Sequence, residues 1–281
     1  MFFKGCPLSC LWCCNPESQR SGPEAVWIRE RCLACGLCLE VCPHHAVSVD
    51  EAGLRHVDGA SCDYCGICAR RCPGEAMNIT GRLVGVDEVL EQVTRDSTFY
   101  DRSGGGMTLS GGEPLAQAAF AGELLRRYKE AEFGASTAIE TCGAVDWEAF
   151  ALVRPHTDVF LFDLKHMDPD EHRRLTGAGN DGILENACRL SKEGGRIIIR
   201  LPLIPGCNDD AENVRRTAVF ARRLAGVERI DLLPYHRLGE VKYPRLGRDY
   251  LLRNTPVPPA VSVATARRLI EGCGVKVRIG G

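Results

Sequence analysis

The stretch DVFLFDLK, residues 158–165, contains four consecutive apolar residues. Such near-continuous apolar strands are typical of a parallel sheet with both faces covered by helices. Side chains alternate along a strand, so Asp163 and Lys165 share one face while Phe160 and Phe162 take the other. The stretch therefore predicts a buried strand with a charged pair at its carboxyl end. That pair is either a simple salt bridge or a contact for a carboxylate-bearing ligand.

Strand-like and helix-like segments alternate on both sides of this stretch. The expected strands are 2–4, 107–110, 135–140, 158–165, 196–204, 229–235 and a short one near 275–279. The expected helices are 86–96, 118–131, 213–225 and about 263–272, the last after a proline-rich linker at 255–262. With residues 2–4 as a truncated first strand, the pattern has six βα units. It predicts an α/β fold, a partial (β/α)6 barrel formed by residues 1–20 and 83–281, with residues 21–82 inserted after the first unit.

The composition is that of an ordinary globular protein, with 281 residues, 44% hydrophobic, 26% charged and a net charge of −2. This length is enough for one core and a small extra unit. Because there is no basic excess, we expect no nucleic-acid partner. No apolar run reaches membrane-spanning length, so we expect no membrane contact. The opening MFF is too short for a signal peptide, which predicts a cytoplasmic location.

Cysteine is unusually frequent, with 16 in the chain and 12 of them before residue 73. Residues 21–82, the cysteine-rich block, contain two runs with the spacing C-x2-C-x2-C-x3-C-P. This is the spacing of bacterial two-cluster ferredoxins, in which the fourth cysteine of each run crosses to the other cluster. We therefore expect two [4Fe-4S] clusters, one held by Cys32, Cys35, Cys38 and Cys72 and the other by Cys62, Cys65, Cys68 and Cys42. Two zinc sites are the weaker alternative, because zinc ligands usually come as separated pairs.

Polar or glycine-rich motifs follow six of the expected strands. They are GCPLSCLWCC (5–14), SGGEP (110–114), ETCG (140–143), DLK (163–165), RLPLIPG (200–206) and PYH (234–236). Sites in parallel α/β folds assemble at the carboxyl ends of strands, so the motifs predict one shared site. Taken singly, Gly111 and Gly112 could form a tight turn, and Arg200 and His236 could be structural. The addition of Glu113 favours a loop that approaches a ligand closely, with a carboxylate placed for an ammonium group.

The stretch GCPLSCLWCCNPE, residues 5–17, holds Cys6, Cys10, Cys13 and Cys14. Cys13 and Cys14 are neighbours, so their side chains normally diverge and both rarely reach one cluster. The stretch therefore favours three ligands and one open iron over a site with four thiolates.

The motif CPLSCLWC, a C-x3-C-x2-C pattern with an aromatic residue before the last cysteine, resembles the radical S-adenosylmethionine enzymes. Together with SGGGMTLSGGEPL, FDLKHMD, IRLPLIPGCND and LLPYHRLG, it makes nearly the whole chain resemble the glycyl-radical enzyme activating enzymes, relatives of pyruvate formate-lyase activase. The resemblance implies that Cys6, Cys10 and Cys13 bind a [4Fe-4S] cluster whose fourth iron takes S-adenosylmethionine. One electron then cleaves the sulfonium, and a 5′-deoxyadenosyl radical takes a hydrogen from a glycine Cα of a partner enzyme.

The resemblance also implies roles for residues at the strand ends. Gly112 and Glu113, with Gly111 beside them, would meet the methionine ammonium. The carboxylate end of the ligand and a monovalent cation would lie at Asp163, Leu164, Lys165 and Thr141. The nucleoside would lie against Arg200 and His236, with Trp12 and Cys14 flanking the cluster.

The cysteine-rich block resembles an insertion carried by activators of decarboxylases, dehydratases, arylsuccinate synthases and choline-type lyases. Its expected role is to relay electrons from flavodoxin or ferredoxin to the open cluster, with docking as the alternative. The implied protein has three [4Fe-4S] clusters and a glycyl-radical enzyme as its protein substrate. Two features depart from the family pattern. Met1 falls inside the first strand, which implies a misassigned start or a weakened sheet edge. The residue after the last cluster cysteine, often histidine in the family, is Cys14.

Two other functions remain open from the sequence alone. One is a radical S-adenosylmethionine enzyme that acts on a small molecule or on ribonucleotide reductase. The other is a non-enzymatic electron carrier, which would not require the α/β region with its GGEP and DLK motifs. The sequence does not name the partner enzyme or its substrate.

Overall fold

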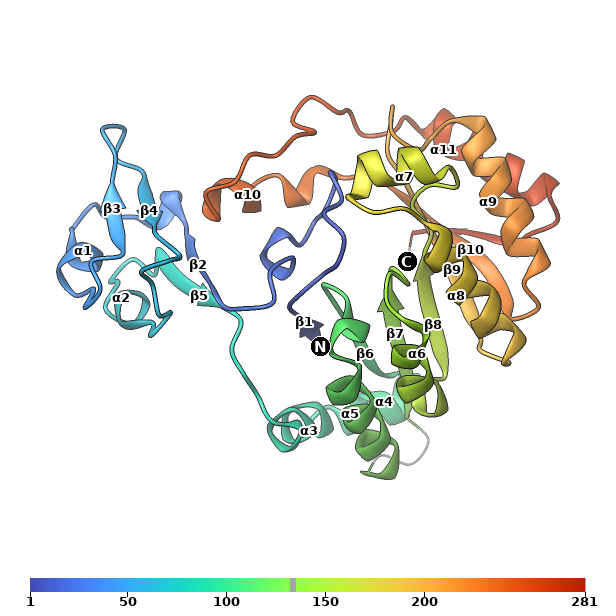
Figure 1. The fold of residues 1–281 in the computed structure, drawn as a ribbon, viewed down its shortest axis with the longest axis horizontal. Helices are drawn as coiled ribbons and strands as arrows, with labels where there is room; N and C mark the ends of the chain where they lie inside the picture. The colour runs from blue at the N-terminus through green and yellow to red at the C-terminus, as the bar shows by residue number, and fades with distance from the viewer. Residues whose placement is uncertain (132–134, 281) are drawn as a thin grey trace.

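The computed structural model describes residues 1–131 and 135–280 (Figure 1). Residues 132–134 and 281, which fall within the predicted 83–281 region, lie outside the described residues. A seven-stranded sheet with the order β1-β6-β7-β8-β9-β10-β11 forms the centre of the larger, α/β part. Its strands are β1 (Phe2–Phe3), β6 (Gly106–Gly111), β7 (Ser136–Thr141), β8 (Val159–Asp163), β9 (Ile197–Leu203), β10 (Val227–Pro234) and β11 (Val277–Ile279). All neighbouring strands pair in parallel, so the predicted succession of strands is confirmed.

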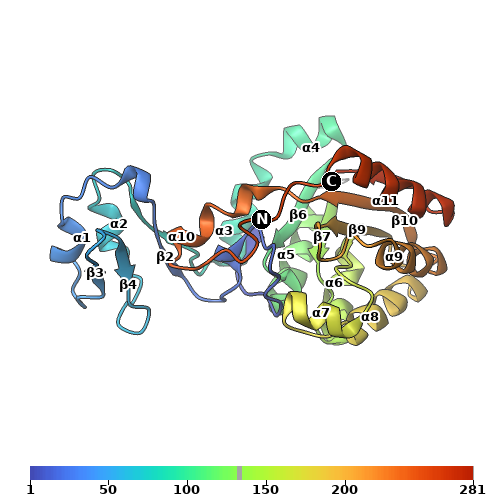
Figure 2. The same ribbon diagram turned by 90° about the horizontal axis from the view of Figure 1, so that it is seen from above.

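Helices follow the strands and pack around the sheet (Figures 1 and 2). They are α3 (Val86–Thr94), α4 (Ser97–Ser103), α5 (Ala118–Ala131), α6 (Trp147–Val153), α7 (Pro169–Thr176), α8 (Asp181–Lys192), α9 (Ala211–Arg223), α10 (Lys242–Arg245) and α11 (Ala260–Gly272). The sequence pattern located α3, α5, α9 and α11 but named none of the others. The helix α11 begins at Ala260, inside the expected linker, because proline is tolerated just before the first helical turn.

The two faces of the sheet differ in burial. On β8, Phe160 and Phe162 are buried and pack with Phe150 of α6, whereas Val159, Leu161 and Asp163 are only half-buried. The same alternation occurs along β7. One face of β8 is thus less buried than expected for a sheet covered on both faces. This face carries Asp163 at its carboxyl end.

The cysteine-rich block has two short antiparallel sheets (Figure 1). Strands β2 (Glu24–Trp27) and β5 (Met77–Thr80) form one, and β3 (Val47–Val49) and β4 (Arg55–Val57) form the other. Two single-turn helices, α1 (Leu37–Glu40) and α2 (Ile67–Arg70), lie beside them. The buried residues Trp27, Ala76 and Met77 pack with four of the cysteines to form a small separate core.

The chain between β1 and β2 lies against the carboxyl ends of the larger sheet. The Gly5 and Cys6 amides donate to the carbonyls of Ser18 and Gln19, and the Ser9 amide donates to Thr176 at the end of α7. None of the helices in the described part of the chain combines the length and hydropathy needed to cross a bilayer.

Candidate functional site

The cysteine loop, residues 6–14, follows β1 directly. Cys6, Cys10 and Cys13 are half-buried, whereas Cys14 is exposed. The loop is fixed by a Cys13 amide that donates to the Cys10 carbonyl at 3.0 Å and by a Tyr243 hydroxyl that donates to the Cys13 carbonyl at 3.0 Å. Burial raises the pKa of the Cys10 thiol to about 11 and that of Cys13 to about 12. Burial raises the pKa of Cys14 as well, so the three cysteines that the spacing selects differ from Cys14 in their solvent exposure.

The GGE loop, residues 111–113, packs against the start of the cysteine loop. The Gly112 amide donates to the Phe3 carbonyl at 2.9 Å, and the Glu113 amide donates to the Gly5 carbonyl at 2.7 Å. A Cβ on Gly112 would lie 2.3 Å from the Gly5 carbonyl oxygen. At Gly111, where φ is +109°, a Cβ would lie 2.4 Å from the Phe3 nitrogen. The GGE loop can therefore lie this close to the segment before Cys6 only because both positions are glycine.

The carboxylate of Glu113 is fully buried and points into the protein. It accepts hydrogen bonds from the Leu115 amide at 3.0 Å, the Thr141 hydroxyl at 2.9 Å and the Cys142 amide at 2.7 Å. Burial raises the pKa of this carboxyl group. Glu113 thus joins the GGE loop to the end of β7, a role that the sequence does not reveal.

The Cys142 thiol lies next to this carboxylate and was not singled out from the sequence, although it belongs to the ETCG motif. Cys142 is buried, and its side chain lowers the pKa of the neighbouring Cys6 thiol. Its backbone amide donates to the Glu113 carboxylate. Cys142 therefore lies between the buried carboxylate and one of the expected cluster ligands.

Charged side chains line the open face of β7, β8 and β9. The Lys165 ammonium lies 3.1 Å from an Asp163 oxygen, and Arg200 lies 2.6 Å from Glu140 and 3.4 Å from Asp163. Asp163 raises the pKa of Arg200, and it raises that of Lys165 despite the opposing effect of burial. The 3.4 Å ion pair joins Asp163 Oδ1 to Arg200 Nε, two buried atoms for which the described residues provide no hydrogen bond. The open face thus holds two carboxylates and two cations close together.

Sequence reasoning missed Glu140, although strand alternation could have found it. In the parallel register Glu140 pairs with Leu161 and Thr141 pairs with Phe162. Glu140 therefore lies on the Asp163 face, whereas Thr141 lies on the buried face. The expectation that Thr141 and Asp163 share a cation is not supported by this placement.

Three further residues that the sequence predicts for the site are Leu164, His236 and Trp12. Leu164 is buried, with its amide bonded to the Arg200 carbonyl, so its side chain does not line the open face. His236 is exposed immediately after β10. Trp12 packs against a group of buried side chains formed by Ile204, Tyr235, Tyr243 and Tyr250. Trp12 of the cysteine loop thus packs against the chain after β10, where His236 also lies.

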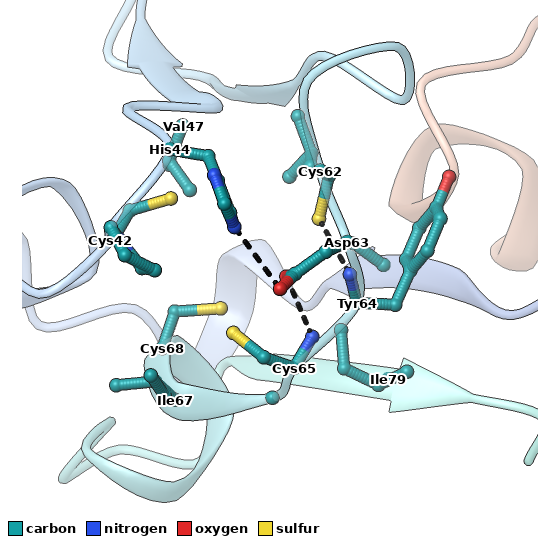
Figure 3. Close-up of a pocket in the computed structure, with 14 residues that line it drawn as sticks. Cys42, His44, Val47, Cys62, Asp63, Tyr64, Cys65, Ile67, Cys68 and Ile79 are labelled. Carbon is teal, nitrogen blue, oxygen red and sulfur yellow. Dashed lines mark hydrogen bonds and ion pairs between the residues drawn. The ribbon is translucent and has the colours of Figure 1, made fainter.

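Eight cysteines of the cysteine-rich block surround two hollows. The Cys62 pocket is lined by Cys42, Cys62, Cys65 and Cys68, and the Cys32 pocket by Cys32, Cys35, Cys38 and Cys72. Figure 3 shows the four sulfur atoms of the Cys62 pocket directed toward one another. Within the described residues, no three His, Cys, Asp or Glu side chains are gathered tightly enough to hold a single metal ion.

The two pockets have matching backbones offset by 30 residues. Ala34 and Tyr64 have φ values of 54° and 57°, and His45 and Glu75 have values of 50° and 51°. Such left-handed conformations are strained in residues other than glycine. The amides of Ala46 and Ala76 donate to the sulfurs of Cys42 and Cys72 at 3.3 and 3.2 Å. Amide donors to sulfur and four thiols per pocket fit iron–sulfur ligation.

Comparisons with known proteins agree with this chemistry. A model of the Radical SAM superfamily matches residues 59–218, and a model of the 4Fe-4S binding domain matches residues 25–48. The chain is 44% identical over 255 residues to the isethionate sulfite-lyase activating enzyme of Nitratidesulfovibrio vulgaris. The matched region covers 89% of this chain and 82% of that protein. It is 40% identical over 278 residues to the choline trimethylamine-lyase activating enzyme of Oleidesulfovibrio alaskensis, covering 97% of this chain and 88% of that protein.

Solved structures are also similar. A domain of pyruvate-formate lyase-activating enzyme from Bacteroides vulgatus matches with a TM-score of 0.53 and 30% identity. The match covers 63% of this chain and 99% of that domain.

Proposed function

The chain belongs to the activating enzymes of glycyl-radical enzymes within the radical SAM superfamily, and we propose how its residues divide the work of that activity. Such an enzyme cleaves S-adenosylmethionine at a [4Fe-4S] cluster, and the cleavage generates a radical on a glycine of its partner. In our proposal, Cys6, Cys10 and Cys13 hold this cluster and Cys14 is not a ligand. The adjacency of Cys13 and Cys14, whose side chains normally diverge, supports this division.

We propose that the methionine end of S-adenosylmethionine lies on the open face at Glu140, Asp163, Lys165 and Arg200. Arg200, expected on the nucleoside side, is included here because it pairs with Glu140 and Asp163. The charged side chains gathered on this face, which could pair with the ammonium and carboxylate groups of the ligand, support this proposal. Gly111 and Gly112 keep the backbone of the GGE loop close to the cysteine loop, and Glu113 anchors the loop from within. The Gly112 amide already donates to Phe3, so Gly112 is proposed to meet the ligand through its backbone carbonyl. A monovalent cation is proposed at Asp163. His236 and Trp12 are proposed to border the nucleoside.

We propose that residues 21–82 form a ferredoxin-like domain with two further clusters, and that residues 1–20 and 83–281 form the S-adenosylmethionine part. The paired pockets support this division. The proposed role of the domain is to pass electrons from flavodoxin or ferredoxin to the cysteine loop. Fully loaded protein would then contain about twelve irons, four for each cluster.

The partner enzyme is a glycyl-radical enzyme, but relatives of similar identity are named for different partners. A relative 39% identical over the whole chain, from Clostridioides difficile, is named for trans-4-hydroxy-L-proline dehydratase, whereas the two relatives above are named for lyases. We therefore propose a lyase or dehydratase of this class as the partner.

The convergence of the cysteine loop, the GGE loop and the charged face is the observation that carries this proposal. To test it, anaerobic, iron-loaded protein is mixed with S-adenosylmethionine, a reductant and each of several candidate partner enzymes. Electron paramagnetic resonance is then recorded. A glycyl radical is expected on at least one partner with the wild type and on none with Cys10→Ala. A Cys10→Ala variant that still cleaves S-adenosylmethionine reductively would refute the cluster assignment.

A further inference from the structure

The cysteine-rich block joins the α/β part at one end of its β2–β5 sheet. Glu24, the first residue of β2, pairs with Lys4 at 3.1 Å and with Arg248. The chain just after β5 contacts the same lysine, because a Cβ on Gly81 would lie 2.3 Å from Lys4 Cδ. Lys4 is two residues before Cys6, so this end of the sheet faces the cysteine loop.

The two pockets lie at different positions along this sheet. In its register, Glu24 is opposite Thr80 and Trp27 is opposite Met77. The Cys62 pocket is lined by Ala25 and Ile79, which adjoin the Glu24 end, whereas the Cys32 pocket is lined by Trp27 and Met77. A strand rises about 3.3 Å per residue, so these lining positions differ by about 7 Å along the strand.

The helices of the block show the same order. The helix α2 carries Cys68 of the Cys62 pocket, and α1 carries Cys38 of the Cys32 pocket. In both Figure 1 and Figure 2, α1 lies farther from the α/β part than α2. Arg245 of α10 also approaches Glu30 at 3.9 Å, but Glu30 is 73% exposed. This contact between long surface side chains does not place the Cys32 pocket against the cysteine loop.

We propose that the Cys62 pocket is the inner of the two centres, facing the cysteine loop, and that the Cys32 pocket is the outer one, open to an external one-electron donor. This inference rests on the proposed two-cluster domain. A donor of the flavodoxin or ferredoxin class would lose one electron, and the centre in the Cys32 pocket would gain it. No bond or proton has to move. Leu33, next to Cys32, is 66% exposed and offers that donor an apolar contact.

The 30-residue repeat provides matched variants for a test that does not depend on activity. Cys62→Ser with Cys65→Ser removes ligands from the inner pocket, and Cys32→Ser with Cys35→Ser removes the equivalent ligands from the outer one. Each full-length protein is loaded with iron, reduced and given S-adenosylmethionine to mark the signal of the cysteine-loop centre. The readout is the line width and power saturation of that signal, which report a neighbouring paramagnetic centre.

The inner-pocket variant should give a narrower, more easily saturated signal than the wild type, whereas the outer-pocket variant should retain the wild-type broadening. The opposite pattern, or an equal effect of both pairs, would overturn the inference. Iron analysis distinguishes this failure from failure of the proposed function. About twelve irons in the wild type and about eight in each variant support three clusters, whereas about four irons in the wild type would refute the domain itself.

Serine variants that lose more than one centre are replaced by Cys65→Asp and Cys35→Asp. Each provides an oxygen ligand in place of sulfur and alters the reduction potential of its centre. This centre can then be left oxidised while the others are reduced. The same assignment then predicts narrowing only for Cys65→Asp, and narrowing only for Cys35→Asp would contradict it.

Discussion

At the scale of single residues, Glu113 shows how burial changes the meaning of a motif. The sequence suggests a carboxylate placed for an ammonium group, but this carboxylate accepts hydrogen bonds from the Leu115 amide, the Thr141 hydroxyl and the Cys142 amide. Its function is to hold the end of β7 against the GGE loop. Glu140 and Asp163 are the carboxylates that lie on the open face, where both pair with Arg200.

Replacing Glu113 by glutamine should destabilise the protein, because the new NH2 group would face N–H and O–H groups that are themselves donors. Leaving a buried polar group unsatisfied costs about 1–3 kcal/mol. Urea unfolding of the metal-free, reduced protein measures this loss. The control Glu212→Gln, 58% exposed on α9, should change the free energy of unfolding by less than about 0.5 kcal/mol. Equal stability of both variants would contradict the anchoring role.

The neighbouring Cys13 and Cys14 provide a second test at this scale. Side chains of neighbouring residues normally diverge, and the C-x3-C-x2-C pattern ends at Cys13, so only Cys13 is expected to bind iron. Cys13→Ser should reduce the iron content by about four per chain, whereas Cys14→Ser and Cys14→His should retain it. Iron analysis with absorption spectra of anaerobically loaded protein checks this. Iron loss in the Cys14 variants would reverse the assignment.

At the scale of elements, β6 and the GGE loop fix the position of the cysteine loop. The strand β1 pairs with the end of β6, with Phe3 opposite Gly111, and the backbone contacts continue to Gly112 and Glu113. The cluster ligands thus start from a backbone that is bonded to the sheet.

Gly112→Ala should push these segments apart, because its Cβ would lie 2.3 Å from the Gly5 carbonyl oxygen. Overpacking of this kind typically costs about 1–3 kcal/mol. We expect a lower urea midpoint and loss of iron from the cysteine-loop centre. Gly22→Ala is the control, because nothing lies within 4 Å of its added Cβ. A Gly112→Ala variant with the stability and iron content of the control would refute the packing argument.

At the scale of the whole molecule, the sequence predicted the order of strands better than the set of helices. Strands such as β8 and β9 are apolar and distinct, whereas α6 has only seven residues and α7 consists mostly of polar residues. The sequence did contain a start signal for α7, because Asp168 is followed by Pro169, a usual pair at the beginning of a helix. In the structure the Asp168 side chain accepts hydrogen bonds from the amides of Asp170 and Glu171. The sequence motifs place the site at the carboxyl ends of the strands. The buried hydrogen bonds of Glu113 and Cys142 could not be predicted, because they depend on contacts between distant segments.

Exposure to air should distinguish the three proposed clusters. A centre with three thiolates keeps an accessible iron, so the cysteine-loop centre should be lost first, and the two centres of the cysteine-rich block, each with four thiolates, more slowly. Electron paramagnetic resonance of samples exposed to air for increasing times follows each signal. Equal rates of loss would count against a three-cysteine site.

The central claim is that this chain takes a hydrogen atom from a glycine of its partner. The most direct test uses a partner enzyme in which glycine carries deuterium at Cα, incubated anaerobically with reduced protein and S-adenosylmethionine. Mass spectrometry of the released 5′-deoxyadenosine measures the transfer. The account predicts deuterium in this product together with a radical on the partner. Unlabelled 5′-deoxyadenosine, formed while no partner acquires a radical, would contradict it.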